Sequence, residues 1–387
     1  MFSTRVPEDL SPNRLARARA SAAVRHDLTV SNPTAVELPY PEGLLDALAD
    51  PAGLAYRPDP RGLLSAREAV ASELRRHGAV VDPERIVLTA STSEAYAFLF
   101  KVLCDPGQAV LVPVPSYPLL EHLARVEGVE AVPYRLDAEH GWRLDVEEIA
   151  AAPESVRAAV VVHPNNPTGS HVHPEDATAL AVLCARRGWA LIADEVFLDF
   201  PLDGGPGAGR SFAARGDCLT FALGGLSKSV GLPQAKLSWI AVSGPDQAAA
   251  PVLERLEFVA DTFLSVATAV QLAAPRLLRE GEAVREAIRG RCRGNLAALC
   301  ALAAQLPAVE ALPVGGGWSA VVRVPAVVGE EELALGLLRE DGVAVQPGYF
   351  FDFARDGYLV VSLLAPPEEF RSGVERVLAR VRRHIAG

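Results

Sequence analysis

The sequence predicts an α/β protein in which a large domain, built on a mainly parallel and doubly wound sheet, is joined to a smaller α+β domain. From residue 85 to 245, short β-rich runs alternate with segments whose apolar residues recur at helical spacing, which is typical of a parallel sheet covered by helices. After Pro251 the pattern changes to long helices and then to mixed strands and helices. A chain of 387 residues also exceeds the roughly 250–300 residues at which single cores stop growing.

The expected elements follow from these periodicities. In the first part we expect strands at 85–89, 109–114, 158–163, 190–193, 219–223 and 238–242, and helices at 93–104, 118–127 and 174–187. In the second part we expect helices at 251–279, 283–306, 330–340 and 367–384, and strands at 318–324, 343–346 and 358–363. Residues 40–270 should form the large domain, and residues 1–39 with 271–387 the small one.

The composition favours a small-molecule ligand. The net charge is −11, whereas a nucleic acid or an anionic membrane would need a basic surface. No apolar run reaches the length of about 18 residues that a membrane-spanning helix requires. The five cysteines are scattered without a C-x-x-C pair, which indicates free thiols in a reducing compartment. The cytoplasm is therefore the expected location, and no metal site is expected.

Lysine is rare in this chain. Only Lys101, Lys228 and Lys236 stand among the 37 basic residues, and the others are arginines. Arginine cannot form an imine and hardly ever gives up its proton. A lysine kept against this background is a hint of chemistry specific to an amine, although chance could also have kept it.

Polar motifs follow or end four of the expected strands. Three of them are His163-Pro-Asn-Asn-Pro-Thr-Gly169, Ala193-Asp194-Glu195-Val196-Phe197 and Gly224-Gly225-Leu226-Ser227-Lys228. By itself Asn-Pro-Thr-Gly is a turn, but the ordered triple at these spacings is far more specific. The fourth run, Ser91-Thr92-Ser93, precedes a helix, where hydroxyls and backbone N–H groups could bind phosphate; taken alone, the run is more often a helix cap. Ligands of doubly wound sheets bind where such loops gather, at the carboxyl ends of the strands.

Together with Tyr56-Arg-Pro-Asp-Pro-Arg-Gly62 and Pro115-Ser-Tyr-Pro118, the three ordered motifs closely resemble those of the class I/II aminotransferases. These are pyridoxal-5′-phosphate (PLP) enzymes of fold type I, and the resemblance runs from about Asn32 to the C-terminus. It implies PLP as the cofactor and ping-pong transfer of an amino group between an amino acid and a 2-oxo acid. It also implies a homodimer in which Tyr56 reaches the phosphate of the neighbouring subunit.

The chemistry of PLP explains the residue types at the implied positions. PLP draws electrons only while its pyridine nitrogen is protonated, so a buried carboxylate must face that nitrogen, and the resemblance gives this role to Asp194. Only a lysine can hold the cofactor as a Schiff base and then shuttle a proton, and this role falls to Lys228. The further cofactor contacts that the resemblance implies are Ser91, Thr92, Ser93, Ser227 and Lys236 near the phosphate, Tyr117 stacked on the ring, and Asn166 at the phenolic oxygen.

The chain departs from the family pattern around the cofactor. Phe197 stands where the family usually has a tyrosine whose hydroxyl helps to hold the phenolic oxygen ionised. Loss of this donor should raise the pKa of the Schiff base and leave Asn166 as the main contact. Gly225 replaces a serine or threonine common three residues before the lysine, and Lys236 replaces an arginine and therefore lacks its bidentate fork.

A further departure concerns the substrate. Val360 aligns with the family arginine that binds the substrate α-carboxylate, and a valine cannot form this charge-assisted pair. Either another arginine replaces it, or the substrate is held differently or lacks that carboxylate. We therefore expect an altered pocket lined by Asn32-Pro33, Trp318 and the segment 349–353, although these aromatics would also suit an ordinary core. The arginines that could take over are Arg57, Arg61, Arg323 and Arg371.

Other functions stay open at this point. A PLP-dependent lyase, racemase or cyclase would share the same cofactor motifs, because only the bond broken at Cα and the place where the proton returns differ. A ligand-sensing module without turnover is less favoured, since no DNA-binding segment precedes the domain. A nicotinamide enzyme is disfavoured as well, because no G-x-G-x-x-G follows the first strand.

Overall fold

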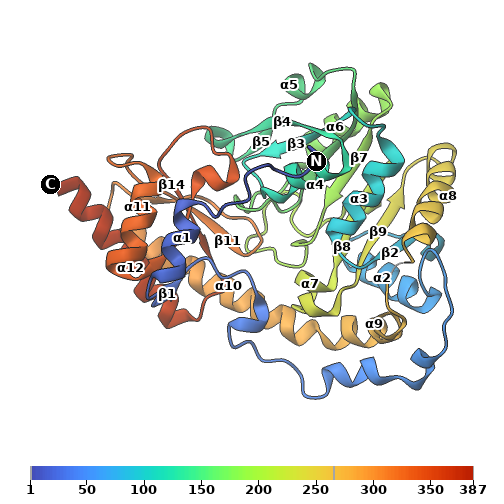
Figure 1. Cartoon of the computed structure of the whole chain (residues 1–387), viewed down its shortest axis with the longest axis horizontal. Coiled ribbons are helices and arrows are strands. Elements are labelled where there is room, and N and C mark those ends of the chain that lie inside the picture. Colours follow the sequence, from blue (N-terminus) through green and yellow to red (C-terminus); the bar gives the residue numbers. More distant parts are fainter. Residues whose placement is uncertain (1, 265, 387) are drawn as a thin grey trace.

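The computed structural model describes residues 2–264 and 266–386, and its central feature is an eight-stranded sheet (Figure 1). Five neighbouring strands, from β8 to β4, are parallel, while β9 and β5 run antiparallel to their neighbours. In the order in which they pair, the strands are β2 (Ile86–Thr89), β9 (Ser238–Ser243), β8 (Thr220–Gly225), β7 (Ala190–Asp194), β6 (Val156–Val162), β3 (Ala109–Val114), β4 (Glu130–Asp137) and β5 (Arg143–Leu144).

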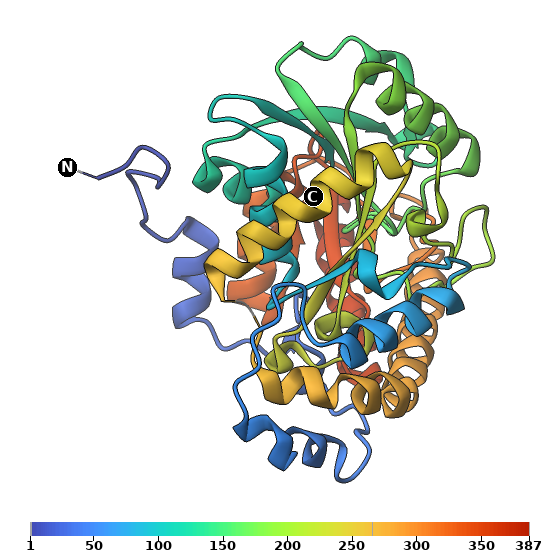
Figure 2. The same cartoon turned by 90° about the vertical axis from the view of Figure 1, so that its right-hand side faces the viewer.

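Helices cover both faces of this sheet, which confirms the doubly wound α/β fold. Buried residues alternate along the strands, so that each face of the sheet contributes to a separate apolar core. In Figure 2, α8 crosses the face of the sheet that is turned toward the viewer. One face packs on α3 (Thr92–Leu103), α4 (Leu119–Glu127) and α8 (Asp246–Phe263), and the other on α2 (Leu64–Arg76), α5 (Val146–Ala150), α6 (Pro174–Arg187) and α9 (Thr268–Glu280).

A second, antiparallel sheet lies in the C-terminal part of the chain. Its strands, in pairing order, are β10 (Glu310–Ala311), β11 (Ser319–Arg323), β14 (Tyr358–Ser362) and β13 (Gln346–Pro347), and the helices beside it are α10 (Glu282–Ala303), α11 (Glu330–Gly336) and α12 (Pro367–Ala386). The N-terminal α1 (Arg14–Ser21) and β1 (His26–Asp27) join this part, and β1 pairs with β12 (Val343–Ala344). In Figure 1 the blue α1 and β1 lie beside the orange and red α11 and α12.

Short helical turns connect these elements. The one that carries the lysine motif is α7 (Leu226–Ser229), which begins directly where β8 ends. The 3-10 turns are η1 (Pro33–Ala35), η2 (Leu44–Ala49), η3 (Pro51–Leu54), η4 (Pro83–Arg85), η5 (Ala138–His140), η6 (Phe212–Ala214), η7 (Pro233–Ala235) and η9 (Gly348–Phe351), and η8 (Leu337–Asp341) is a π-helical turn.

The prediction of a single helix at 251–279 was wrong, because the structure has two helices in this region. Helix α8 ends at Phe263, Leu264 and Val266 have positive φ angles of 54° and 49°, and α9 begins at Thr268. A left-handed residue ends a helix, and this position carries no glycine that would announce it in the sequence. Pro251 also lies inside α8 rather than at its start.

Among the described residues, no helix combines the length and the apolar character that crossing a lipid bilayer requires.

Candidate active site

The side chain of Lys228 projects from α7 into an apolar environment at the carboxyl ends of the parallel strands. Its Nζ lies 5.0 Å from the centre of the Trp318 ring and 5.7 Å from that of Phe197. It makes no hydrogen bond with any other residue that the structure describes. Burial lowers the pKa of Lys228, and the charge of Asp194 opposes this shift only in part. The result is an amine that loses its proton more readily than an ordinary lysine.

Asp194 ends the neighbouring strand β7, where it pairs with Leu223 of β8. Its Oδ2 accepts a hydrogen bond of 3.0 Å from the hydroxyl of Tyr96, and its Oδ1 accepts one of 3.2 Å from the backbone N–H of Val196. Burial raises the pKa of Asp194, although both hydrogen bonds and the charge of Lys228 oppose the shift. A cation placed against this carboxylate would favour its ionised form.

The turn at 163–169 contributes a pair of asparagines. Asn165 is buried, and its Nδ2 donates to the carbonyl of Pro115 at 2.9 Å, which connects this turn to the segment containing Tyr117. The next residue, Asn166, accepts a hydrogen bond of 3.3 Å from the hydroxyl of Ser319, at the start of β11. The turn therefore fixes Asn166 between the large sheet and the small one.

A close contact between two glycine-containing turns places Trp318. Gly315 and Gly316 both donate backbone N–H groups to the carbonyl of Gly169, at 3.1 and 2.9 Å. Gly169 has a φ of +68°, and a Cβ added to it would lie 2.6 Å from the carbonyl oxygen of Gly316, so only glycine fits there. The turn 315–317 leads directly to Trp318 and brings its ring over Lys228.

Trp318 forms an aromatic wall with Phe197 and Phe200, with ring centres 5.3 and 5.1 Å from its own. The Trp318 side chain is buried, yet its Nε1–H has no acceptor within the described parts of the chain. An unpaired buried donor costs on the order of 1–3 kcal/mol. This donor beside Lys228 is therefore available to a ligand.

The serine-rich run lies at the N-terminus of α3. The Ser91 hydroxyl accepts a hydrogen bond of 3.1 Å from the backbone N–H of Glu94 and so caps the helix, as the simpler interpretation had it. The backbone N–H groups of Thr92 and Ser93 belong to the first turn, which has no intrahelical acceptors for them. With the helix dipole, these groups suit an anion.

Four expected contacts lie at the surface of this single chain. Tyr56 is 76% exposed and Tyr117 is 49% exposed. Lys236 is also exposed, has a left-handed backbone with a φ of 53°, and forms no ion pair with another described residue. Asn32 is exposed too, and its side-chain oxygen accepts from the backbone and the hydroxyl of Thr34. The structure thus brings Lys228, Asp194, Asn166, Phe197 and Trp318 together but leaves these four at the rim.

Val360 is buried in β14, where its side chain packs with Val321, Phe351 and Tyr358. Two of the arginines that could replace the missing cation are already ion-paired. Arg61 contacts Glu257 at 2.7 Å, and Arg323 contacts Glu310. Arg57 and Arg371 are the remaining candidates, and both are exposed.

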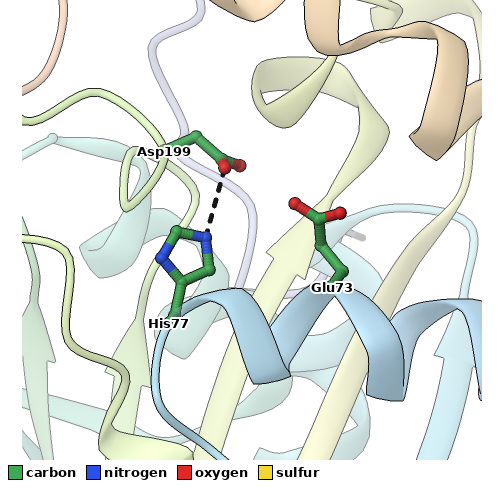
Figure 3. Close-up of side chains that lie close together, drawn as sticks. All are labelled: Glu73, His77 and Asp199. Atoms are coloured by element: carbon green, nitrogen blue, oxygen red, sulfur yellow. Dashed lines mark hydrogen bonds and ion pairs between the residues drawn. The ribbon is translucent and has the colours of Figure 1, made fainter.

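A buried ion-pair network supports the lysine-bearing turn. Figure 3 shows Glu73 and His77 at the end of α2, facing Asp199, and their potential ligand atoms lie within 4.8 Å of one another. Arg285, only 1% exposed, lies 2.9 Å from Glu73 and 3.4 Å from Asp199, and Arg76 contacts both carboxylates as well. Arginines thus already supply positive charge beside these carboxylates, so the cluster is a salt-bridge network rather than a set of free metal ligands.

This network reaches the lysine-bearing turn through Ser229. Arg285 donates from Nε to the Ser229 carbonyl at 3.0 Å and from a terminal nitrogen to the Ser229 hydroxyl at 3.3 Å. His77 takes part as a cation, since its Nδ1 faces the carbonyl of Gly209 at 3.1 Å and its Nε2 faces Asp199 at 3.2 Å. Both partners are acceptors, so only the doubly protonated ring satisfies them.

Known proteins agree with this geometry. The model of the family "aminotransferase class I and II" matches residues 33–377. The arginine–pyruvate transaminase of Pseudomonas aeruginosa is 30% identical over 346 residues, which cover 88% of this chain and 85% of that protein. The S-alkyl-thiohydroximate lyase of Arabidopsis thaliana is 31% identical over 246 residues, which cover 62% of this chain and 53% of that protein.

Among solved structures, a mutant of the aspartate aminotransferase of Thermus thermophilus has a TM-score of 0.84 and 26% identity, and the match covers 98% of this chain and 99% of that one. Fold and site thus define a PLP enzyme of fold type I. The chain belongs to the class I and II aminotransferases, which are PLP-dependent transferases acting on amino acids and oxo acids. The expectations for family, fold, cofactor and enzyme class are confirmed.

Sequence reasoning missed two residues of the site. Tyr96 binds Asp194, and Ser319 binds Asn166. Tyr96 lies one helical turn after Thr92, so a search along α3 for further polar residues at that spacing would have found it. Ser319 comes from the small sheet, and no local pattern in the sequence connects it to the turn at 163–169.

The His77–Asp199 pair should make stability depend on pH. Burial alone would lower the pKa of His77, but the hydrogen bond and the charge of Asp199 outweigh it and raise the pKa above its ordinary value of 6.5. The stabilisation is therefore complete below pH 6.5 and is lost as the pH rises through the pKa of the folded state. We expect His77→Gln to cost about 1.5–3 kcal/mol of unfolding free energy at pH 6 and much less at pH 9.

Thermal or urea unfolding of both proteins at the two pH values measures this difference. Glu73 and Glu195, whose pKa values burial also raises, titrate nearby, but they are present in both proteins and their direct contributions largely cancel in the comparison. Equal losses at pH 6 and pH 9 would contradict a charged His77.

Proposed function

We propose that this aminotransferase holds PLP as a Schiff base on Lys228 and that the same amine then shuttles the proton in a ping-pong transfer. One observation carries the proposal. The Lys228 amine is desolvated, has no hydrogen-bond partner among the described residues, and lies beside the half-buried carboxylate of Asp194 at the end of the adjacent strand. Desolvation keeps an amine nucleophilic near neutral pH.

The surrounding residues fit the cofactor. Bound PLP supplies an electron sink at the substrate Cα, which the protein itself lacks. Asp194 would hold a proton on the pyridine nitrogen, and Tyr96 and Val196 keep its carboxylate oriented. Asn166 would bind the phenolic oxygen, the role that the replacement of tyrosine by Phe197 leaves mainly to it. The phosphate contacts proposed for this chain are Ser91, Thr92, Ser93, Ser227 and Lys236, with Tyr117 against the ring.

The substrate pocket is proposed to differ from that of relatives with a carboxylate-binding arginine. Val360 is enclosed by apolar side chains, so this position supplies no charge that could bind a substrate carboxylate. Asn32 and Trp318 are the proposed pocket residues, and the unpaired Trp318 Nε1–H supports this role. The arginine–pyruvate transaminase relative makes a basic amino acid and pyruvate reasonable first substrates to test.

A homodimer is proposed because the segment of η2 and η3 exposes apolar side chains. Leu54 is 93% exposed, Tyr56 76% and Leu45 46%, and the segment projects from the body in Figures 1 and 2. Exposed apolar groups gathered on one segment are typical of an interface. A second copy covering them would receive Tyr56 at its own cofactor phosphate.

The division into a large domain of residues 40–270 and a small one of residues 1–39 with 271–387 stays a proposal. Leu28 and Val36 share one apolar core with β11 and β14, which supports the inclusion of the N-terminal arm in the small domain. A cytoplasmic location is proposed too, supported by five cysteines that form no disulfide in the described residues.

A second candidate function is lyase chemistry on the same cofactor, since one relative is named a lyase. The cofactor residues would be the same in both cases. Only the bond broken at the substrate Cα or beyond it, and the place where the proton returns, would differ.

The first prediction concerns Lys228. The purified protein should absorb as an imine, and borohydride should fix the cofactor to Lys228, because only this amine is desolvated at the site. Lys228→Ala should lose the band and the fixed label, with Lys101→Ala as the matched control that keeps both. A stoichiometric amino acid should bleach the band of the wild type and release the oxo acid. Release of any other product would favour the lyase reaction.

A second prediction tests whether Tyr56 acts on the partner subunit. Lys228→Ala and Tyr56→Ala proteins are expected to have little activity alone, because each homodimer lacks one component in both sites. Random exchange of subunits at equal amounts should restore about one quarter of the native sites, since half of the dimers are mixed and each has one complete site. Activity after mixing measures this, and no recovery in verified mixed dimers would exclude the role in trans.

A third prediction follows from Val360. We expect donors that are held through their α-carboxylate, aspartate and glutamate included, to bind weakly, with KM values raised by a factor of about 10 or more relative to a donor that is bound through other groups, because no arginine at 360 binds that carboxylate. Steady-state kinetics over a panel of amino acids measures this. Ordinary turnover of aspartate or glutamate with typical affinity would show that another group has replaced the arginine completely.

A further inference from the structure

A serine on β9 faces the glycine that departs from the family pattern. Gly225 is the last residue of β8, three residues before Lys228, and it pairs directly with Ser238, the first residue of β9. On its other side Ser238 pairs with Thr89, the last residue of β2. Ser238 therefore lies between the strand that leads to the 91–93 run and the strand that leads to the lysine-bearing turn.

The two positions compete for one volume. A Cβ added to Gly225 would lie 2.2 Å from the Ser238 Oγ and 3.0 Å from its Cβ, so a side chain at 225 and the present Ser238 side chain exclude each other. The backbone does not require glycine there, because Gly225 has a φ of 178°, which any residue can adopt. Residue 225 is a glycine because Ser238 fills the space that a larger residue would need. The Ser238 hydroxyl lies where the Cβ of a side chain at position 225 would be.

The Ser238 hydroxyl is also available. The residue is only 2% exposed, and its Oγ makes no hydrogen bond with any other described residue. Unlike the Oγ of Ser243, the Oγ of Ser238 is not one of the fully enclosed atoms that lack a partner, so a ligand can still reach this unpaired hydroxyl. Its partner on β2, Thr89, leads within three residues to the first turn of α3, where the backbone N–H groups of Thr92 and Ser93 suit an anion.

We propose that Ser238 supplies, from the neighbouring strand, the phosphate-binding hydroxyl that Gly225 lacks. The inference rests on the proposed function, because it places the phosphate of PLP at this end of the sheet. A chain with a serine or threonine at 225 and a small residue at 238 would present the same hydroxyl from β8 instead of β9. The hydroxyl donates to a phosphate oxygen, so its contribution depends on the phosphate and not on the pyridine ring.

The experiment compares two ligands that differ only in the phosphate. The full-length protein, freed of cofactor, is titrated with PLP and with pyridoxal, and the imine absorbance reports binding. Ser238→Ala should weaken PLP about 10-fold, as expected for one charge-assisted hydrogen bond, and should leave pyridoxal unchanged. The matched control is Ser243→Ala, because Ser243 is buried at the opposite end of the same strand and its Oγ has no partner among the described residues either. This variant should bind both ligands like the wild type.

A reciprocal exchange gives the sharper test. Ser238→Gly alone should weaken PLP like Ser238→Ala, and Gly225→Ser added to it should restore most of the lost affinity by returning a hydroxyl from β8. Equal weakening of PLP and pyridoxal by Ser238→Ala would show a merely structural role, and unchanged PLP affinity would show that the hydroxyl does not meet the phosphate. Either result overturns the inference and leaves the Lys228 proposal intact. Failure of the wild type to form an imine with PLP would overturn both.

Discussion

The pairing of β7 with β8 is the constraint on which the site depends. Because the two strands are parallel and adjacent, their carboxyl ends bring Asp194 and the Lys228 turn to one edge of the sheet. Burial disfavours the charged form of both groups, so it raises the pKa of the Asp194 carboxyl and lowers the pKa of the Lys228 amine. The sheet thus supplies both a less basic amine and a carboxylate ready for a cationic partner.

The charged groups next to the lysine-bearing turn are buried, so each of them needs an opposite charge nearby. Arg285 is almost completely buried, and its guanidinium contacts Glu73, Asp199 and the Ser229 carbonyl. With Arg76 and His77 on one side and Glu282 on the other, three basic groups meet three acidic ones, so the network is close to neutral. Removal of one partner would leave a buried charge uncompensated, which is far more costly than the pair is stabilising. The lysine-bearing turn is therefore held by an ion-pair network in which the loss of one residue would destabilise the others.

Trp318, the central ring of the aromatic wall, comes from the segment that enters the other sheet. The contact of Gly169 with the 315–317 turn brings Trp318 over Lys228, and Ser319 reaches Asn166 from the same strand. The ring of Phe197 completes this wall and supplies no hydroxyl, while Val360 lies in an apolar cluster where a charge would be unpaired. The wall beside Lys228 thus combines rings from both parts of the fold, since Phe197 and Phe200 follow β7 and Trp318 precedes β11.

The sequence by itself determined the doubly wound sheet and the order of the motifs, because these follow from local periodicity. The resemblance of the motifs to those of the class I/II aminotransferases then led to the choice of Lys228, Asp194 and Asn166. It did not reveal β4, whose first four residues are only half-buried or exposed, or the break between α8 and α9, where no glycine marks the left-handed residue. Tertiary structure alone decided that Tyr96 and Ser319 bind the site and that Ser238 fills the space of Gly225. The physical reason is that these contacts join residues distant in sequence, and only the packing of strands and sheets sets the distance between them.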